Sequence, residues 1–211
     1  MTHFIVLIIV PQHIYKQGQS EVESYIASRM RPYDRNLKIQ PPYIQYTEAD
    51  LNKMYEEYKK HNDPDTTASL KDYCVNYCGY KLNQNGNAVS TFNKNSFFDS
   101  YVIGGLWNGL LTNNQQLQYQ LLSNYENHTI INNSCKIKDY LERYCESKNI
   151  ENHQQPCTII DVNGILHKVG QYGWFEQFVQ ITQQNKWKQA FENVLHISNH
   201  DNYLVGLDCS A

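Results

Sequence analysis

The hydrophobic residues of the chain follow two periods, which separate expected helices from expected strands. Apolar side chains spaced i, i+3, i+4 and i+7 are typical of a helix with one buried face. Four segments fit this spacing, and the first has Thr47 as its expected N-cap and the second has Gly79 as its expected C-terminal stop. The stripes are Leu51, Met54, Tyr55 and Tyr58; Leu70, Tyr73, Cys74 and Tyr77; Ile137, Tyr140, Leu141 and Tyr144; and Trp187, Ala190, Phe191, Val194 and Leu195.

β-Branched and aromatic runs between turn signals predict the strands. They cover residues 3–10, 100–103, 106–111, 157–161, 165–169 and 203–207, and the second and third form one bent strand or a tight pair. Asn163-Gly164 predicts a hairpin between 157–161 and 165–169. The apolar run 4–10 is too short to cross a bilayer and lacks the basic flank and cleavage site of a signal peptide, so we interpret it as a buried strand.

The order of these elements predicts an α+β fold with a mixed, mainly antiparallel sheet and helices packed on it. A length of 211 residues fits a single domain over 1–211. Residues 112–156 are rich in Asn and Gln and carry one short helix, for which Ser134 is the expected N-cap. We therefore expect 112–156 to be an insertion.

Charge and cysteine content narrow the classes of partner. The net charge is −3 and the pI is about 6.2, and the chain has no Lys/Arg run, which argues against nucleic acid and membrane surfaces as partners. Asn and Gln make up about a fifth of the chain, which is typical of AT-rich coding and leaves a neutral surface poorly protected against self-association. Six Cys without an export signal indicate thiols in a cytoplasmic protein, and Cys74 and Cys78 fit a helix core better than a metal site.

The segment 99–109 has the most ligand-like local pattern. A β-branched and aromatic run meets Gly104-Gly105, and glycine within a strand marks a bulge or a close backbone approach. Aromatic walls with a few polar groups describe many small-ligand sites. The candidate ligand-binding residues are Asp99, Tyr101, Gly104, Gly105, Trp107, Asn108, His167 and Trp174. The alternative is that Trp107 and Trp174 are core residues.

A second hypothesis places a divalent metal at the ends of the strands. Asp99, Asp161 and Asp208 lie at strand ends, His167 lies on the hairpin, and such a group could activate water for hydrolysis. The alternative is that these carboxylates cap turns, which suits Asp161 before Asn163-Gly164. The sequence has no Gly-x-Ser-x-Gly elbow and no Walker or Rossmann glycine loop.

Several short motifs occur in an order that resembles a known family. They are Arg31-Pro32-Tyr33-Asp34 with Asn36, Gly86-Asn87-Ala88 with Ser90-Thr91, Tyr101-Val102-Ile103-Gly104-Gly105 with Trp107 and Gly109, Gly170 with Gly173-Trp174-Phe175, and Asp208-Cys209. The set resembles an uncharacterised family of phage and bacterial proteins, cyanobacterial and actinobacterial ones included, with no established activity. The resemblance covers most of the chain except roughly 112–156 and implies a shared fold.

Two positions depart from that family pattern. The family tends to have Arg after the Gly-Gly pair and His after the terminal Asp-Cys, where this chain has Leu106 and Ser210. Arg is the natural clamp for a phosphate or carboxylate, and His is a common acid or base. Their replacement lowers the expectation of anion chemistry and of an active enzyme.

Together these patterns favour a non-enzymatic cytoplasmic protein that binds either a small molecule, for example a nucleotide-like one, or a partner protein. The resemblance adds a link to phages or mobile elements. The alternative is a metal-dependent hydrolase acting on a nucleotide or nucleic acid. The first hypothesis needs no cofactor. The oligomeric state stays open, and the amide-rich surface leaves an assembly role as a third hypothesis.

Overall fold

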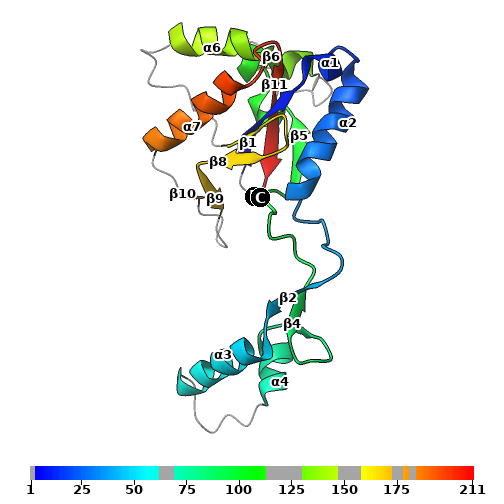
Figure 1. Ribbon diagram of the computed structural model, residues 1–211, viewed down its shortest axis with the longest axis vertical. Helices are drawn as coiled ribbons and strands as arrows, with labels where there is room; N and C mark the ends of the chain where they lie inside the picture. Colours follow the sequence, from blue (N-terminus) through cyan, green and yellow to red (C-terminus); the bar gives the residue numbers. More distant parts are fainter. Residues whose placement is uncertain (1–2, 62–68, 113–129, 147–157, 173–177, 181–183) are drawn as a thin grey trace. The chain divides into compact units, whose positions relative to one another are not determined.

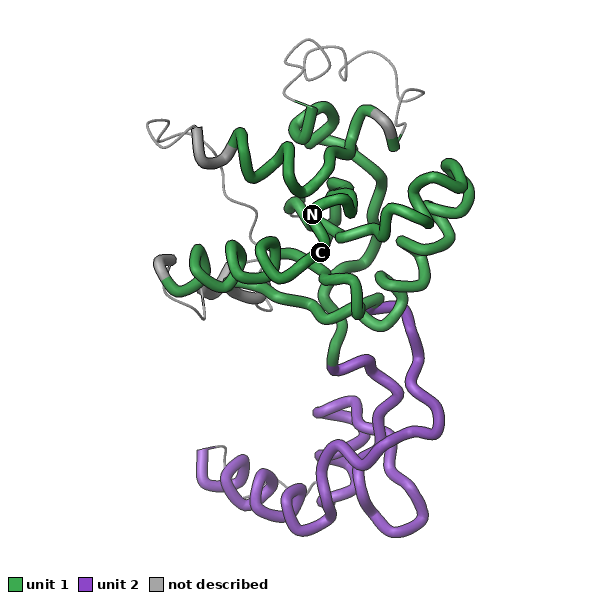
Figure 2. Tube along the Cα trace, turned by 45° about the horizontal axis from the view of Figure 1, so that its top comes forward, with its two compact units in different colours: residues 1–34, 95–211 green, residues 35–94 purple. Residues whose placement is uncertain are grey.

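The chain forms two compact units. The computed structural model describes residues 3–61, 69–112, 130–146, 158–172, 178–180 and 184–211. Unit 1 comprises residues 1–34 and 95–211, and unit 2 comprises residues 35–94 (Figure 2). The expected single domain is thus divided, because the apolar residues of 35–94 pack among themselves while those of unit 1 pack around its sheet.

Unit 1 is built on a six-stranded sheet whose long central strands are the first and last of the chain. Its path runs β5-β11-β1-β7-β8, and β6 also pairs with β11. β1 is parallel to β7, and every other pairing in this sheet is antiparallel, which confirms the mixed, mainly antiparallel α+β fold. The strands are β1 (His3–Val10), β5 (Ser100–Ile103), β6 (Ser134–Lys136), β7 (Thr158–Ile160), β8 (Leu166–Lys168) and β11 (Tyr203–Ser210).

Helices cover both faces of this sheet, so alternate residues of β1 enter different cores. Phe4, Val6, Ile8 and Val10 pack with α2 (Gln19–Met30) on one face. Ile5, Leu7 and Ile9 pack with α6 (Ile137–Glu146) and α7 (Gln184–Ile197) on the other (Figure 1). The uninterrupted apolar run of β1 is therefore the sequence of a strand buried on both sides.

Short elements complete unit 1. The hairpin of β9 (Gly170–Tyr172) and β10 (Phe178–Gln180) forms a separate two-stranded sheet. α2 was not among the expected helices because it buries only a thin stripe, Val22, Ile26 and Met30. The remaining elements are α1 (Gln12–Tyr15) and the 3₁₀ turns η1 (Arg31–Tyr33), η3 (Gly105–Trp107), η4 (Leu110–Thr112) and η6 (Ile131–Asn133).

Unit 2 packs two helical segments on a three-stranded sheet of order β2-β4-β3. Its buried core is small, Leu51, Tyr73, Cys74 and Ala88, and several half-buried tyrosines surround it. The elements are β2 (Tyr43–Tyr46), α3 (Glu48–His61), α4 (Leu70–Asp72), a π-helix η2 (Tyr73–Tyr77), β3 (Lys81–Leu82) and β4 (Ala88–Ser90).

Most expected elements are confirmed, and two details are wrong. Residues 106–111 form 3₁₀ turns rather than a strand, because the chain bends sharply at Gly104-Gly105. Ser134 lies in β6 rather than capping a helix. The expectation that 112–156 is an insertion stays a prediction, and the described part of this segment supplies β6 to the main sheet and α6 to its core.

Candidate functional site

The Gly-Gly bend follows β5 and lies beside β11, at the edge of that strand with which both β5 and β6 pair. β5 pairs with Leu207–Ser210 of β11, and β6 pairs with Tyr203–Val205 of the same strand. Between them, the Gly206 carbonyl accepts a hydrogen bond from the Gly104 amide at 2.9 Å. The chain leaves the sheet at this point and forms η3, so the bend fills the gap between β5 and β6.

Glycine is required at both positions of the bend. Gly104 has φ +77° and Gly105 has φ +51°, a region that L-residues with a Cβ rarely adopt. A Cβ at Gly104 would lie under 3.0 Å from the Asn133 amide, and one at Gly105 would lie under 3.0 Å from the Asp208 side chain. The bend thus wraps closely around two buried polar residues.

Asp208 holds the bend to the first strand. One carboxylate oxygen accepts a hydrogen bond from the Leu106 amide at 3.0 Å, and the other accepts one from His3 Nδ1 at 2.9 Å. The Asp208 side chain is 4% exposed, whereas that of His3 is 42% exposed. A buried carboxylate therefore fixes the orientation of an imidazole that solvent can reach.

Two serines and two apolar side chains lie beside this pair. His3 is opposite Ser210 in register, and Ser210 is opposite Ser100, so their side chains share one face of the sheet. The two serine hydroxyls are hydrogen-bonded at 2.7 Å. Val102, opposite Asp208, and Leu106 are both more than half exposed. We call this surface the bend site: His3, Ser100, Val102, Leu106, Asp208 and Ser210.

Two buried polar atoms on the bend lack a hydrogen-bond partner within the structure as described. They are Nε1 of Trp107 and Oδ1 of Asn108. Trp107 is partly buried against the core on the α6 and α7 face of the sheet, and Asn108 is 3% exposed. By contrast, Asn133 is equally buried, and its Oδ1 accepts a hydrogen bond from the Gly109 amide at 3.1 Å. An unpaired buried donor and an unpaired buried acceptor on consecutive residues are rare in folded proteins.

The other residues expected to bind a ligand are not part of the bend site. Asp99 precedes β5, and its amide donates to the Ser210 carbonyl. Tyr101 packs on the opposite face of the sheet, edge-on to Phe98, and burial raises its pKa. Trp174 lies outside the described residues.

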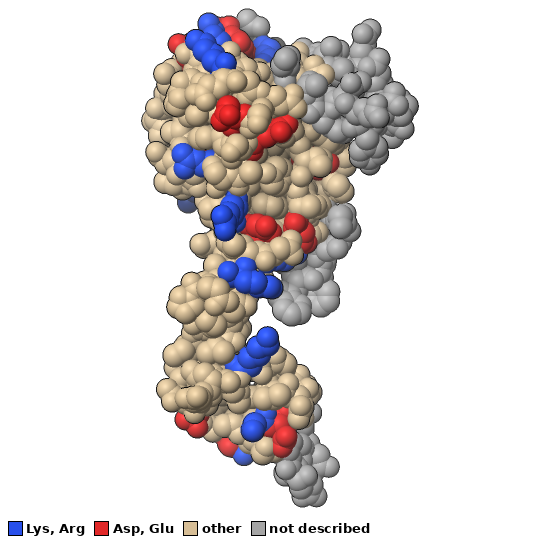
Figure 3. Space-filling view, turned by 90° about the vertical axis from the view of Figure 1, so that its right-hand side faces the viewer, with Lys and Arg blue, Asp and Glu red and all other residues tan. Residues whose placement is uncertain are grey.

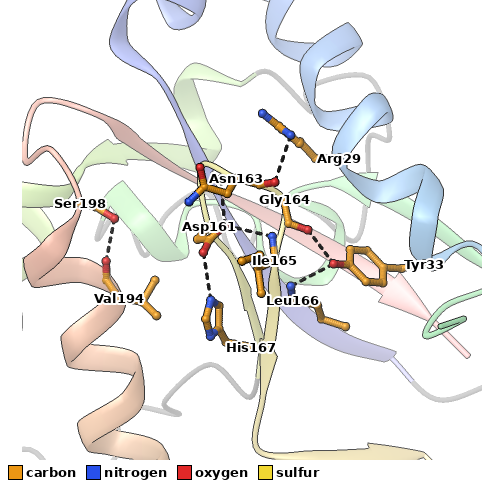
Figure 4. A network of polar contacts seen from close by, with 10 residues as sticks. All are labelled: Arg29, Tyr33, Asp161, Asn163, Gly164, Ile165, Leu166, His167, Val194 and Ser198. Carbon is orange, nitrogen blue, oxygen red and sulfur yellow. Dashed lines mark hydrogen bonds and ion pairs between the residues drawn. The ribbon is translucent and has the colours of Figure 1, made fainter.

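His167 belongs to a separate network on the β7–β8 hairpin (Figure 4). The carboxylate of Asp161 accepts from the amides of Asn163 and Ile165 and contacts His167 Nε2 at 3.1 Å. Figure 4 also shows the Tyr33 hydroxyl between the Gly164 carbonyl and the Leu166 amide. Asp161 therefore caps the Asn-Gly turn, as the simpler interpretation of its position predicts.

The metal hypothesis gains no support from this geometry. Asp208 is opposite Ile5 in β1, whereas Ile160, just before Asp161, lies beside Ile8 on the other edge of β1. This register separates the two carboxylates by more than about 10 Å. Among the described residues, no three His, Cys, Asp or Glu side chains gather as a metal site would need.

Three polar residues of the bend site were missed as site residues from the sequence: His3, Ser100 and Ser210. Their partners lie far along the chain: His3 and Asp208 are 205 positions apart. The signal that could have found them is the pairing of two apolar runs near the two ends of the chain, which would bring His3 beside Asp208 and Ser210.

The comparisons with known proteins place the chain in no group. No family model, curated protein or solved structure matches it. Within the described ranges, none of the helices combines the length and the apolar character needed to cross a bilayer.

Proposed function

We propose that this chain is a non-enzymatic binding protein whose unit 1 takes a small uncharged molecule at the Gly-Gly bend. The observation that carries the proposal is the pair of unpaired buried atoms, Trp107 Nε1 and Asn108 Oδ1. Each such group destabilises a fold by about 1–3 kcal/mol, so two of them lower the free energy of unfolding appreciably. A ligand that offers one acceptor and one donor would satisfy both atoms.

The surroundings of the bend favour a neutral ligand. Leu106 occupies the position at which a phosphate-clamping Arg would be expected from the motif resemblance, and it is exposed. Val102 and Leu106 offer apolar contact, and His3 and the serine pair offer neutral polar contact. An amide, a lactam or the edge of an uncharged nucleobase fits this combination better than a nucleotide, whose phosphates would lack an Arg or Lys partner at the bend site.

The setting of the protein also stays a proposal. Cys74, Cys78, Cys135 and Cys209 are free thiols, as expected in the cytoplasm. On the face drawn in Figure 3, acidic and basic side chains are interspersed among a mostly neutral surface. A partner protein on Val102 and Leu106 is the other form of the binding hypothesis, and a link to phages or mobile elements rests on the motif resemblance alone.

A binding screen with two indole variants tests the proposal. Uncharged nucleobases, nucleosides and small amides are screened by thermal shift, and hits are measured by calorimetry. Trp107→Phe keeps an aromatic ring and removes the donor, so the affinity of a bend ligand should fall about tenfold. Trp187→Phe removes an indole buried in the α7 core and should leave the affinity unchanged. A hit that binds both variants as it binds the parent protein would show that the ligand lies elsewhere.

A further inference from the structure

Unit 2 has an open surface pocket lined by tyrosines, which the bend site does not involve and which we call the cavity. Its volume is about 300 Å³, and its lining is Tyr58, Asp72, Tyr73, Asn76 and Tyr77. Tyr58 comes from α3, and the other four come from the consecutive segments α4 and η2. Such a volume is at the lower end of the range for small-molecule sites.

The backbone of this cavity has an unusual form. Residues 73–77 are a π-helix, in which the Cys78 amide donates to the Tyr73 carbonyl five residues earlier. Single π turns are uncommon and occur frequently at functional sites. This one aligns Tyr73 and Tyr77, whose rings stack with centroids 5.7 Å apart and planes 19° apart.

The three tyrosine rings form one aromatic surface. Tyr58 lies 4.8 Å from Tyr73 and 4.9 Å from Tyr77, centroid to centroid. Tyr73 is buried, whereas Tyr77 is 68% exposed, which is unusual for so large a ring. The faces of such rings carry partial negative charge and attract cations.

Asp72 adds a full negative charge at the edge of this surface. It closes a capping box with Ser69, and its other oxygen accepts a hydrogen bond from the side-chain Nδ2 of Asn76 at 3.4 Å. The Ser69 hydrogen bonds, followed by the charge of Lys71, hold the pKa of Asp72 below its usual value. The carboxylate is therefore ionised at neutral pH and held in place by the start of α4.

Two lysine side chains of the same unit lie over tyrosine rings. Lys59 Nζ lies 4.6 Å from the centroid of Tyr55, and Lys94 Nζ lies 4.1 Å from the centroid of Tyr43. Neither of these rings lines the cavity. The rings that line it combine the same aromatic faces with an ionised carboxylate, so the cavity is complementary to a cation brought from outside.

We propose that the cavity of Tyr58, Tyr73, Tyr77 and Asp72 binds an organic cation of the methylammonium class. A methylated ammonium group is large, weakly hydrated and without a directional donor, so aromatic faces recognise it better than they recognise an inorganic cation. The site lies in unit 2 and is independent of the proposed function of unit 1.

Choline and its uncharged analogue 3,3-dimethyl-1-butanol provide the test. The two have the same shape, and only choline carries a charge. The full chain is titrated with each compound while the amide signals of residues 72–77 are followed by two-dimensional NMR. We expect saturable shifts with choline in the millimolar range and shifts at least fivefold smaller with the alcohol. Equal responses to both compounds, or shifts with choline that do not saturate, would overturn the proposal.

Four substitutions at three positions locate the response. Tyr77→Leu keeps apolar bulk and removes the ring face, so choline affinity should fall about two- to fivefold, whereas Tyr77→Phe should retain it. Asp72→Asn keeps an acceptor for Ser69 and removes the charge, and it should weaken choline binding by a similar factor. Val75→Ala changes an exposed residue of the same π-helix that does not line the cavity, and it should have no effect. If Tyr77→Leu and Val75→Ala behave alike, no cation site exists here.

Discussion

Two buried asparagines at the bend should respond in opposite ways to replacement by leucine. Asn108→Leu should raise the free energy of unfolding, and Asn133→Leu should lower it. Asn108 is 3% exposed with an unpaired Oδ1, and Asn133 is 1% exposed with an Oδ1 that accepts from the Gly109 amide. The residue type and burial match, and the two side chains differ in whether the carbonyl oxygen has a hydrogen-bond donor. The pair therefore compares an unsatisfied buried carbonyl oxygen with a satisfied one.

The magnitudes follow from this difference. Asn108→Leu removes an unsatisfied group that costs about 1–3 kcal/mol and buries an apolar side chain, while crowding by the wider methyl groups offsets part of the gain. We expect a net increase of about 1–3 kcal/mol in the free energy of unfolding. Asn133→Leu leaves the Gly109 amide without its acceptor, so we expect a decrease of about 1–3 kcal/mol or more.

Urea unfolding monitored by tryptophan fluorescence measures both effects. All three Trp residues lie in unit 1, so the signal reports the unit that carries the bend. The midpoints are compared at an unchanged denaturant slope, which excludes a change in the unfolded state as the cause. A decrease in stability for Asn108→Leu comparable to that for Asn133→Leu would refute the reasoning, because it would mean that the Asn108 amide is paired in the folded protein.

Three further predictions concern other parts of the structure. Gly105→Ala should destabilise unit 1 by more than about 2 kcal/mol, because a Cβ at φ +51° meets the Asp208 side chain. Thermal unfolding measures this, and an unchanged midpoint would contradict it. The depressed pKa of Asp72 predicts that its contribution to unit 2 is complete above about pH 4 and is lost as the pH falls through the folded-state pKa, so Asp72→Asn should flatten this acid limb in an NMR titration. Burial raises the pKa of the Cys209 thiol, and raises that of Cys135 to about 11, so both should be alkylated more slowly than the unfolded chain, and mass spectrometry of peptides after timed alkylation measures this.

The local sequence predicts the elements of the fold well where packing follows a simple period. The run 3–10 is the central strand β1, the stripe from Leu51 to Tyr58 is the buried side of α3, and Asn163-Gly164 is the turn between β7 and β8. In each case the pattern reflects one continuous buried face or one turn type. The local sequence is therefore enough to predict these elements without knowledge of their tertiary contacts.

The bend and the division into units were not predictable in the same way. Residues 106–111 have the composition of a strand, and they turn instead because Asp208 and Asn133, both distant along the chain, occupy the space beside Gly104 and Gly105. The unpaired atoms of Trp107 and Asn108 depend on what surrounds them, which no local pattern encodes. The segment 35–94 carries the same helical and strand periods as its flanks, so its separate core was not visible in the sequence.

The position of β11 in the sheet has a consequence for how the protein is made. β11 lies between β1 on one side and β5 and β6 on the other, yet it is the last of these strands in chain order. During synthesis, β1, β5 and β6 leave the ribosome before their shared partner exists, whereas every strand of unit 2 is complete by Ser90. Unit 2 can thus form while the ribosome is still translating, and a nascent chain halted before Tyr203 would lack the partner strand for one edge of the apolar β1.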